Sequence, residues 1–103
     1  MGCGRVGTAL ATELDEAGHE VVVIDRQASA FVRLPDAFRG RTITGVGFDQ
    51  RVLEEAGVAG ADAFAAVSSG DNSNIIAARV ARERFGVERV IARIYDAGRA
   101  EVY

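Results

Sequence analysis

The sequence predicts an α/β domain built on a doubly wound parallel sheet. Apolar runs alternate strictly with helical segments along the 103 residues, the order typical of parallel strands joined by right-handed crossovers. The run Val21–Ile24 shows no polar alternation, which indicates a strand covered on both faces. Near the start, G-x-G-x-x-G spans Gly2 to Gly7, and Asp25 ends the next strand 18 residues later. That is the spacing of a dinucleotide-binding βαβ unit.

Composition limits the class of protein. A chain of 103 residues makes one domain, and 49% hydrophobic with 26% charged residues is ordinary for a globular chain. All 12 basic residues are scattered arginines and the net charge is −3, so no nucleic-acid partner is expected. The single cysteine excludes an internal disulfide and suits a reducing cytoplasm. No apolar run approaches the ~18–20 residues of a membrane span, so we expect any membrane connection to pass through a partner.

The first half of the chain gives three helical segments and two strands. Residues 5–17 form an amphipathic helix ended by Gly18, with His19 as a solvated turn residue. The apolar residues at helical spacing, expected to face the core, are Val6, Ala9, Leu10, Leu14 and Ala17. The remaining predicted elements are a strand at 20–25, a short helix at 29–34 with Phe31, Val32 and Leu34 turned inward and Pro35 ending it, a strand at 41–45, and a helix at 50–56 capped by Asp49 and ended by Gly57.

The second half repeats the alternation. A strand is expected at 62–67, followed by a polar loop at 68–74. A helix then runs to Phe85 and is ended by Gly86; its predicted buried face consists of Ile76, Ala77, Val80, Ala81 and Phe85. A last strand is expected at 89–94, and Asp96 is expected to cap a helix, of which 100–103 is too short to be stable alone.

The glycine motif normally follows a strand, and here only Met1 precedes it. In a Rossmann-like strand order of 3-2-1-4-5 that strand is the centre of the sheet. We therefore expect the strands at 20–25 and 62–67 to flank a gap. Residues 1–103 are interpreted as a single domain that lacks its first strand and its C-terminal helices, truncated at both ends.

The motif has a mechanical interpretation. Gly2 allows a sharp turn, Gly4 lets the backbone approach a phosphate, and Gly7 lets the helix lie close to the sheet. The first helical turn offers unpaired N–H donors to an anion. Asp25 would accept hydrogen bonds from ribose hydroxyls and repel a 2′-phosphate. The alternative is that the glycines only tighten a turn and Asp25 is the polar end of a strand.

Several segments together resemble one family. They are Gly2-Cys3-Gly4-Arg5-Val6-Gly7, Gly18-His19-Glu20-Val21, Ile24-Asp25, Gly47-Phe48-Asp49 and Val67-Ser68-Ser69-Gly70-Asp71-Asn72-Ser73-Asn74-Ile75. Nearly the whole chain is similar to the N-terminal RCK (KTN, TrkA-N) nucleotide-binding domain of the Trk/Ktr potassium-uptake regulatory proteins. Val46 departs from the family pattern, which often has an acidic residue there.

The resemblance implies a set of cofactor-binding residues. Arg5 matches an arginine that faces the phosphates, Asp25 matches the ribose-binding acid, and Arg93 matches a basic position after the last strand. The full set is Gly2, Cys3, Gly4, Arg5, Val6, Gly7, Asp25, Arg26, Gly45, Val46, Gly47, Ser68, Ser69, Asp71 and Arg93. For the polar residues of 68–74, plain capping of the following helix is the alternative to ligand contact.

The resemblance also implies a function. We expect a cytoplasmic regulatory domain that senses NAD(H) or ATP/ADP and gates a potassium channel or transporter. Its partners would be a membrane-embedded pore subunit and further copies of itself, dimers building a ring at the inner face of the membrane. No catalytic residue, metal site or direct membrane insertion is expected.

Two other functions stay open at the level of sequence. The chain could be the cofactor domain of an NAD-dependent dehydrogenase whose catalytic residues lie elsewhere, because fold alone does not decide between sensing and catalysis. It could also be a scaffold that keeps the fold without a ligand.

Overall fold

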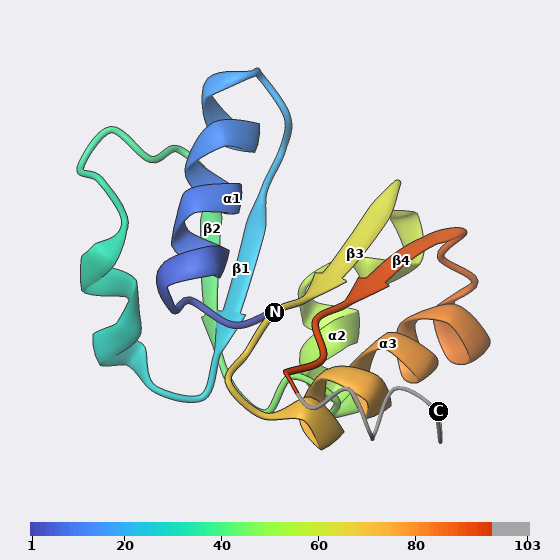
Figure 1. The fold of residues 1–103 in the computed structure, drawn as a ribbon. Helices are drawn as coiled ribbons and strands as arrows, with labels where there is room; N and C mark the ends of the chain where they lie inside the picture. The colour runs from blue at the N-terminus through green and yellow to red at the C-terminus, as the bar shows by residue number, and fades with distance from the viewer. Residues whose placement is uncertain (96–103) are drawn as a thin grey trace.

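The structure, a computed structural model, describes residues 1–95 (Figure 1). In chain order the elements are α1 (Arg5–Glu16), β1 (Val22–Asp25), the 3₁₀ helix η1 (Ala28–Arg33), β2 (Arg41–Thr44), α2 (Gln50–Glu55), the 3₁₀ helix η2 (Val58–Gly60), β3 (Ala63–Ala66), α3 (Asp71–Phe85) and β4 (Arg89–Ala92). The predicted alternation of strands and helices is confirmed. The predicted cap at Asp96 and the segment 100–103 lie outside the described residues.

The strands of residues 1–95 form two parallel pairs, β1 with β2 and β3 with β4. The gap expected between the strands at 20–25 and 62–67 is thus present, and each pair has the neighbours that a 3-2-1-4-5 order requires. The segment Met1–Gly2 lies between the pairs and bonds to both. The Met1 amino group donates to Ala65 O at 2.9 Å, Val67 N donates to Met1 O at 2.9 Å, and Gly2 N donates to Ile24 O at 2.7 Å. Burial lowers the pKa of the Met1 amino group to about 6, because desolvation disfavours its charged form.

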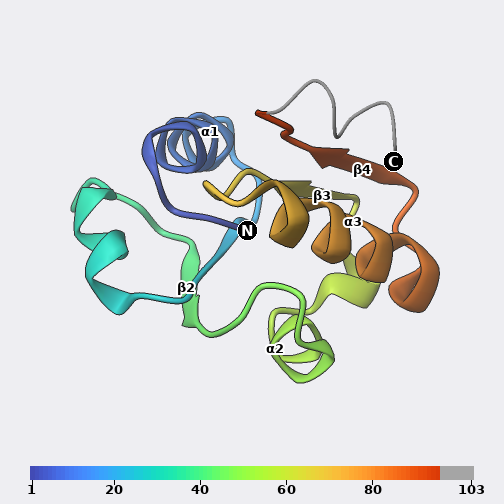
Figure 2. The ribbon, with the colours of Figure 1, turned by 60° about the horizontal axis from the view of Figure 1, so that its bottom comes forward.

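Helices cover both faces of the strands, as the doubly wound arrangement requires. Val23 belongs to a small core with Cys3 and Ala11 on the face covered by α1 and η1. The neighbouring Ile24 points the other way, into a larger core that includes Leu53 of α2 and residues of α3. In Figure 2, α1 and α2 lie on opposite sides of the strands.

The buried face of α1 differs from the prediction. Gly7, Ala11 and Asp15 are its buried residues, whereas Val6 and Leu14 are each 38% exposed. A methyl group at position 7 would overlap the Gly2 carbonyl oxygen, so α1 packs against the segment Met1–Gly2 through this side. The close approach at Gly7 therefore sets the rotation of the helix and leaves much of its apolar stripe at the surface.

The other corrections concern short segments. In η1, Val32 was predicted to face inward but is 80% exposed, because a 3₁₀ helix repeats every three residues and brings Phe31 and Leu34 onto the same side. In α3, Ile76 is 45% exposed, and the helix begins at Asp71, so 71–74 is not loop. An acidic side chain in a first turn is favourable beside the positive end of the helix dipole.

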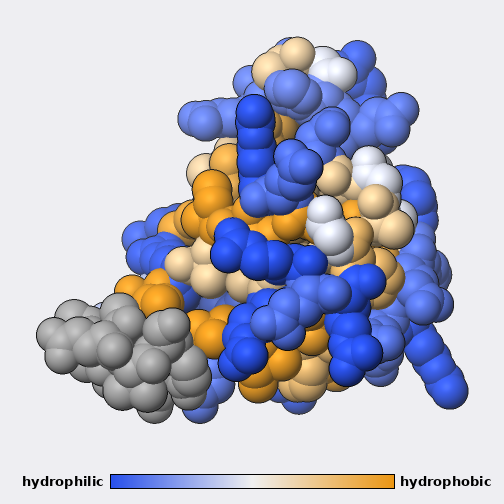
Figure 3. Space-filling model, turned by 90° about the vertical axis from the view of Figure 1, so that its right-hand side faces the viewer, coloured by the Kyte–Doolittle hydropathy of each residue, from blue (hydrophilic) through white to orange (hydrophobic). Residues whose placement is uncertain are grey.

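Other predicted features are confirmed. Asp49 caps α2 by accepting a hydrogen bond from Arg51 N at 2.8 Å. Gly18, Gly57 and Gly86 follow the three α-helices with positive φ. The face of the molecule beyond β4 shows hydrophobic surface between hydrophilic residues (Figure 3), and β4 itself exposes 65% of Ile91.

We expect Gly7→Ala to lower the free energy of unfolding by about 2 kcal/mol, because the added methyl group forces α1 away from the Gly2 carbonyl. The matched control is Gly60→Ala, where a Cβ meets no other atom within 4 Å. Urea denaturation of both variants measures the difference. Equal stability of the two variants would contradict the close contact at position 7.

Candidate functional site

A cleft of about 810 Å³ lies at the carboxyl ends of β1, β2 and β3, beside the first turn of α1. Ligands of open α/β sheets bind at such an edge. Eleven of the residues predicted from the sequence line it: Gly2, Gly4, Arg5, Val6, Asp25, Arg26, Val46, Gly47, Ser68, Ser69 and Arg93. Four others do not line it: Cys3, Gly7, Gly45 and Asp71. The cleft therefore brings together segments that follow all four strands of residues 1–95.

The glycine loop presents free backbone donors. The N–H groups of residues 4–7 donate to no other group within residues 1–95, and Gly4 has no side-chain cap. The first turn of a helix offers such unpaired N–H groups, together with the positive end of the helix dipole, to an anion. A methyl group on Gly4 would meet no protein atom within 4 Å, so the protein's own packing does not require glycine there. The open space above Gly4 fits a bound phosphate.

Asp25 is held in place by the backbone. Its Oδ2 accepts from Cys3 N at 2.8 Å and its Oδ1 accepts from Gln27 N at 2.9 Å. Each carboxylate oxygen has a second acceptor position. The half-buried carboxylate is thus fixed at the end of β1 with capacity left for hydroxyl groups of a ligand.

Cys3 supports the loop from within. Its N–H is used by Asp25, its carbonyl accepts from Arg33 Nη1 at 3.2 Å, and its buried Sγ lies 3.5 Å from Thr8 Oγ1. Neither backbone group of Cys3 therefore faces the cleft. The role of Cys3 is to position Asp25 and Arg33.

The opposite wall is organised by Asn74, which is fully buried. Its Oδ1 accepts from Ser68 N at 2.9 Å and from Ser68 Oγ at 2.6 Å. Its Nδ2 donates to Ser68 O and to Arg93 O, both at 2.9 Å. The hydrogen bonds of the Asn74 side chain thus hold Ser68 and Arg93 together, and Asn74 does not cap α3.

Asp71 also works inside the wall. Its Oδ1 accepts from Tyr95 N at 2.7 Å, which ties the start of α3 to the chain after β4. The Arg93 guanidinium lies 4.3 Å from the centroid of the Tyr95 ring, within the range of a cation–π contact. Arg93 is therefore held at the cleft by its side chain as well as by its backbone.

In the segment after β2, one residue packs against α2 and the next two line the cleft. Gly45 N donates to Asp25 O at 2.9 Å, and a Cβ at Gly45 would lie 2.6 Å from Val52 Cγ2. Gly45 is therefore needed for packing against α2. Val46 and Gly47 line the cleft, and a Cβ on Gly47 would collide with the Met1 side chain.

The charge of the cleft is opposite to that of the chain. Arginines 5, 26, 33 and 93 line it against the single carboxylate of Asp25, although the chain as a whole carries −3. Low-dielectric walls lined by one sign of charge concentrate the opposite ion. The cleft is therefore suited to an anionic ligand.

Sequence reasoning missed several lining residues. They are Met1, Gln27, Ala30, Arg33, Phe48, Val67, Gly70, Ser73 and Tyr95. Gln27, Phe48 and Gly70 lie within three positions of predicted residues in the loops after strands, and extending those loops would have included them. Arg33 had no such signal, because η1 carries it back to the glycine loop from 30 residues further along the chain.

Residues 1–95 contain no group of three or more His, Cys, Asp or Glu side chains placed to hold a metal ion. None of their helices is both long and apolar enough to span a membrane.

The parallel strands, the helices on both faces and the glycine loop at the strand ends define a Rossmann-like α/β domain. The comparison with family models gives the particular family: the TrkA-N domain matches residues 1–103. The chain belongs to the TrkA-N family.

Individual relatives agree. The chain is 69% identical over 103 residues to the Trk system potassium uptake protein TrkA of Streptomyces coelicolor, covering all of this chain and 46% of that protein. It is 36% identical over its whole length to a Trk system potassium uptake protein TrkA homolog of Pyrococcus abyssi, covering 45% of it. With TrkA of Halomonas elongata it shares 35% identity over 94 residues, 91% of this chain and 21% of that protein. The chain spans less than half the length of these relatives.

We expect Asn74→Ala to cost about 3 kcal/mol of unfolding free energy, because it leaves part-buried backbone groups of Ser68 and Arg93 without these partners and empties a fully buried site. The control, Ser69→Ala, alters an exposed residue of the same loop and should change stability by less than about 0.5 kcal/mol. Chemical denaturation measures both. A loss below that control value for Asn74→Ala would show that the four hydrogen bonds are not needed.

Proposed function

We propose that this domain binds an adenine nucleotide, NAD(H) or ATP/ADP, in the cleft. One observation carries the proposal: the N–H groups of residues 4–6 have no hydrogen-bond partner within residues 1–95, and these residues line a cleft that also contains four arginines. Phosphate oxygens are acceptors that such donors match, and the arginines add charge-assisted hydrogen bonds. The ribose would then lie at Asp25, whose carboxylate is fixed by Cys3 N and Gln27 N.

The domain is proposed to act as a regulator of potassium uptake rather than as an enzyme. The relatives are named as Trk system potassium uptake proteins, which favours a membrane-embedded potassium pore subunit as partner. No residue of the cleft suggests hydride-transfer chemistry, so no observation favours the dehydrogenase alternative. We place the domain in the cytoplasm, at the inner face of the membrane through that partner.

Regulation needs only differential binding. A nucleotide shifts an equilibrium between two arrangements of the assembly by the difference in its affinity for them. Coupling of ~1–3 kcal/mol is typical and changes a population by roughly 5- to 150-fold. In this proposal a homo-oligomer, dimers building a ring, supplies the two arrangements, and the cleft reports which nucleotide is present.

Gly4→Ala tests the phosphate site. The added methyl group meets no protein atom but occupies the space above the free N–H groups, so we expect unchanged stability and at least about tenfold weaker nucleotide binding. Gly60→Ala is the control, since its methyl group is equally unhindered and Gly60 does not line the cleft. Calorimetric titration of the full-length proteins with ATP, ADP and NADH gives the affinities. Wild-type affinity in Gly4→Ala would overturn the proposed phosphate position, and matched potassium-uptake assays in cells test the regulatory role.

The position of Asp25 predicts selectivity at the ribose. NADH should bind at least about tenfold more tightly than NADPH, because the fixed carboxylate accepts from a 2′-hydroxyl and repels a 2′-phosphate. In Asp25→Asn the preference should largely disappear, since the charge is removed while the side-chain shape is kept. Competitive titration measures both ratios. A wild-type protein that prefers NADPH would contradict this role of Asp25.

A further inference from the structure

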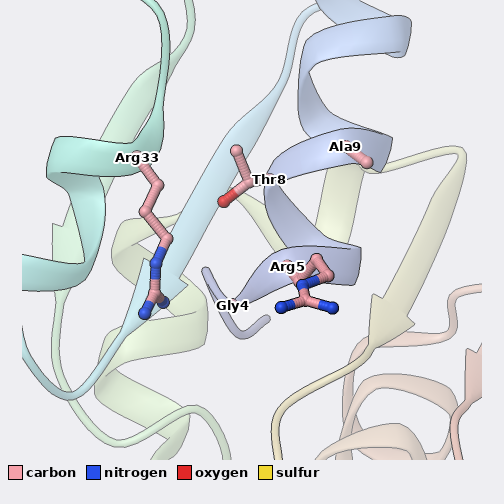
Figure 4. Close-up of a pocket in the computed structure, with 5 residues that line it drawn as sticks. All are labelled: Gly4, Arg5, Thr8, Ala9 and Arg33. Atoms are coloured by element: carbon pink, nitrogen blue, oxygen red, sulfur yellow. The ribbon is translucent and has the colours of Figure 1, made fainter.

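Arg33 forms a second arginine wall beside the glycine loop. It lies at the end of η1, and its Nη1 donates to the Cys3 carbonyl at 3.2 Å. Figure 4 shows its side chain reaching from η1 toward Gly4, with the Arg5 guanidinium on the other side of that loop. Two elements far apart in sequence thus place guanidinium groups on either side of Gly4.

These two arginines line a cavity of their own. It measures about 600 Å³ and is lined by Gly4, Arg5, Thr8, Ala9 and Arg33. Three of these residues, Gly4, Arg5 and Arg33, also line the larger cleft, so the two spaces meet at the glycine loop. Asp25 lines only the larger one. A ligand with its ribose at Asp25 therefore passes Gly4 before it enters the smaller cavity.

The charge of the smaller cavity determines what fits there. It has no lining carboxylate, and neither Arg5 nor Arg33 forms an ion pair with a carboxylate of residues 1–95. A guanidinium has five N–H donors, and Arg33 uses one on Cys3, which orients the remaining donors. Both arginines are exposed and hydrated, so the cavity needs no counter-charge from the protein, but a phosphate would accept charge-assisted hydrogen bonds from both guanidinium groups.

We propose that Arg33, together with Arg5, binds the distal phosphates of a nucleoside polyphosphate. This inference rests on the proposed function and deepens it. It predicts that ATP binds more tightly than ADP or AMP, because more of its phosphates reach the smaller cavity. It also ranks ATP above NADH, whose second half would bring an uncharged nicotinamide group past the glycine loop. Arg33 is then the residue that sets specificity for the terminal phosphates.

The test is a binding series on the full-length protein without divalent cations. ATP, ADP, AMP and NADH are titrated into wild type, Arg33→Gln and Arg84→Gln; the last removes an exposed arginine at the far end of α3. We expect wild type to bind ATP at least about tenfold more tightly than AMP and more tightly than NADH. Arg33→Gln should lose about tenfold for ATP and less than about twofold for AMP, and Arg84→Gln should match wild type.

The outcomes separate this inference from the function on which it rests. Equal losses for ATP and AMP in Arg33→Gln would show a purely structural role and overturn the inference. Tighter binding of NADH than of ATP would also overturn it, while leaving nucleotide sensing intact. If no nucleotide binds, the proposed function fails, and inorganic tripolyphosphate becomes the probe. If wild type binds tripolyphosphate and Arg33→Gln does not, the two arginines still form a polyphosphate site. If wild type does not bind tripolyphosphate, the inference is overturned.

Discussion

The hydrogen bond from Cys3 N to the Asp25 carboxylate, 2.8 Å long, is the contact on which the site depends. It joins the glycine loop to the end of β1, so that the acid proposed to bind the ribose and the loop proposed to bind phosphate are held as one unit. The same residue anchors Arg33 through its carbonyl. With the N–H of Cys3 bonded to Asp25, the free donors beside the cleft are those of residues 4–6.

Much of the fold follows from local sequence. Continuous apolar runs marked β1 and β3, and glycines with positive φ ended the three α-helices of residues 1–95, because both signals depend on neighbouring residues alone. The buried side of α1 could not be predicted in that way. Its orientation is set by the contact of Gly7 with the Gly2 carbonyl, which outweighs the apolar stripe containing Val6 and Leu14.

The candidate site shows the same division. Glycine spacing and the acid at the end of β1 located the loop and Asp25, and the resemblance located the polar residues after β3. The residues that sequence reasoning misplaced or missed are positioned by contacts between segments distant in sequence. Asp71 was expected at the ligand but binds Tyr95 N, and Arg33 was not expected at all, since the path of η1 has no signature in the chain.

The hydrogen bonds of Asn74 have a consequence for motion within the domain. They join α3, the loop after β3 and the chain after β4, so opening that corner requires breaking all of them together. We expect the amide hydrogens of such a unit to exchange cooperatively. By contrast, η1 has no buried residue and lies at the low-stability end of the molecule. We therefore expect the η1 side of the cleft to be displaced more readily than the side held by Asn74.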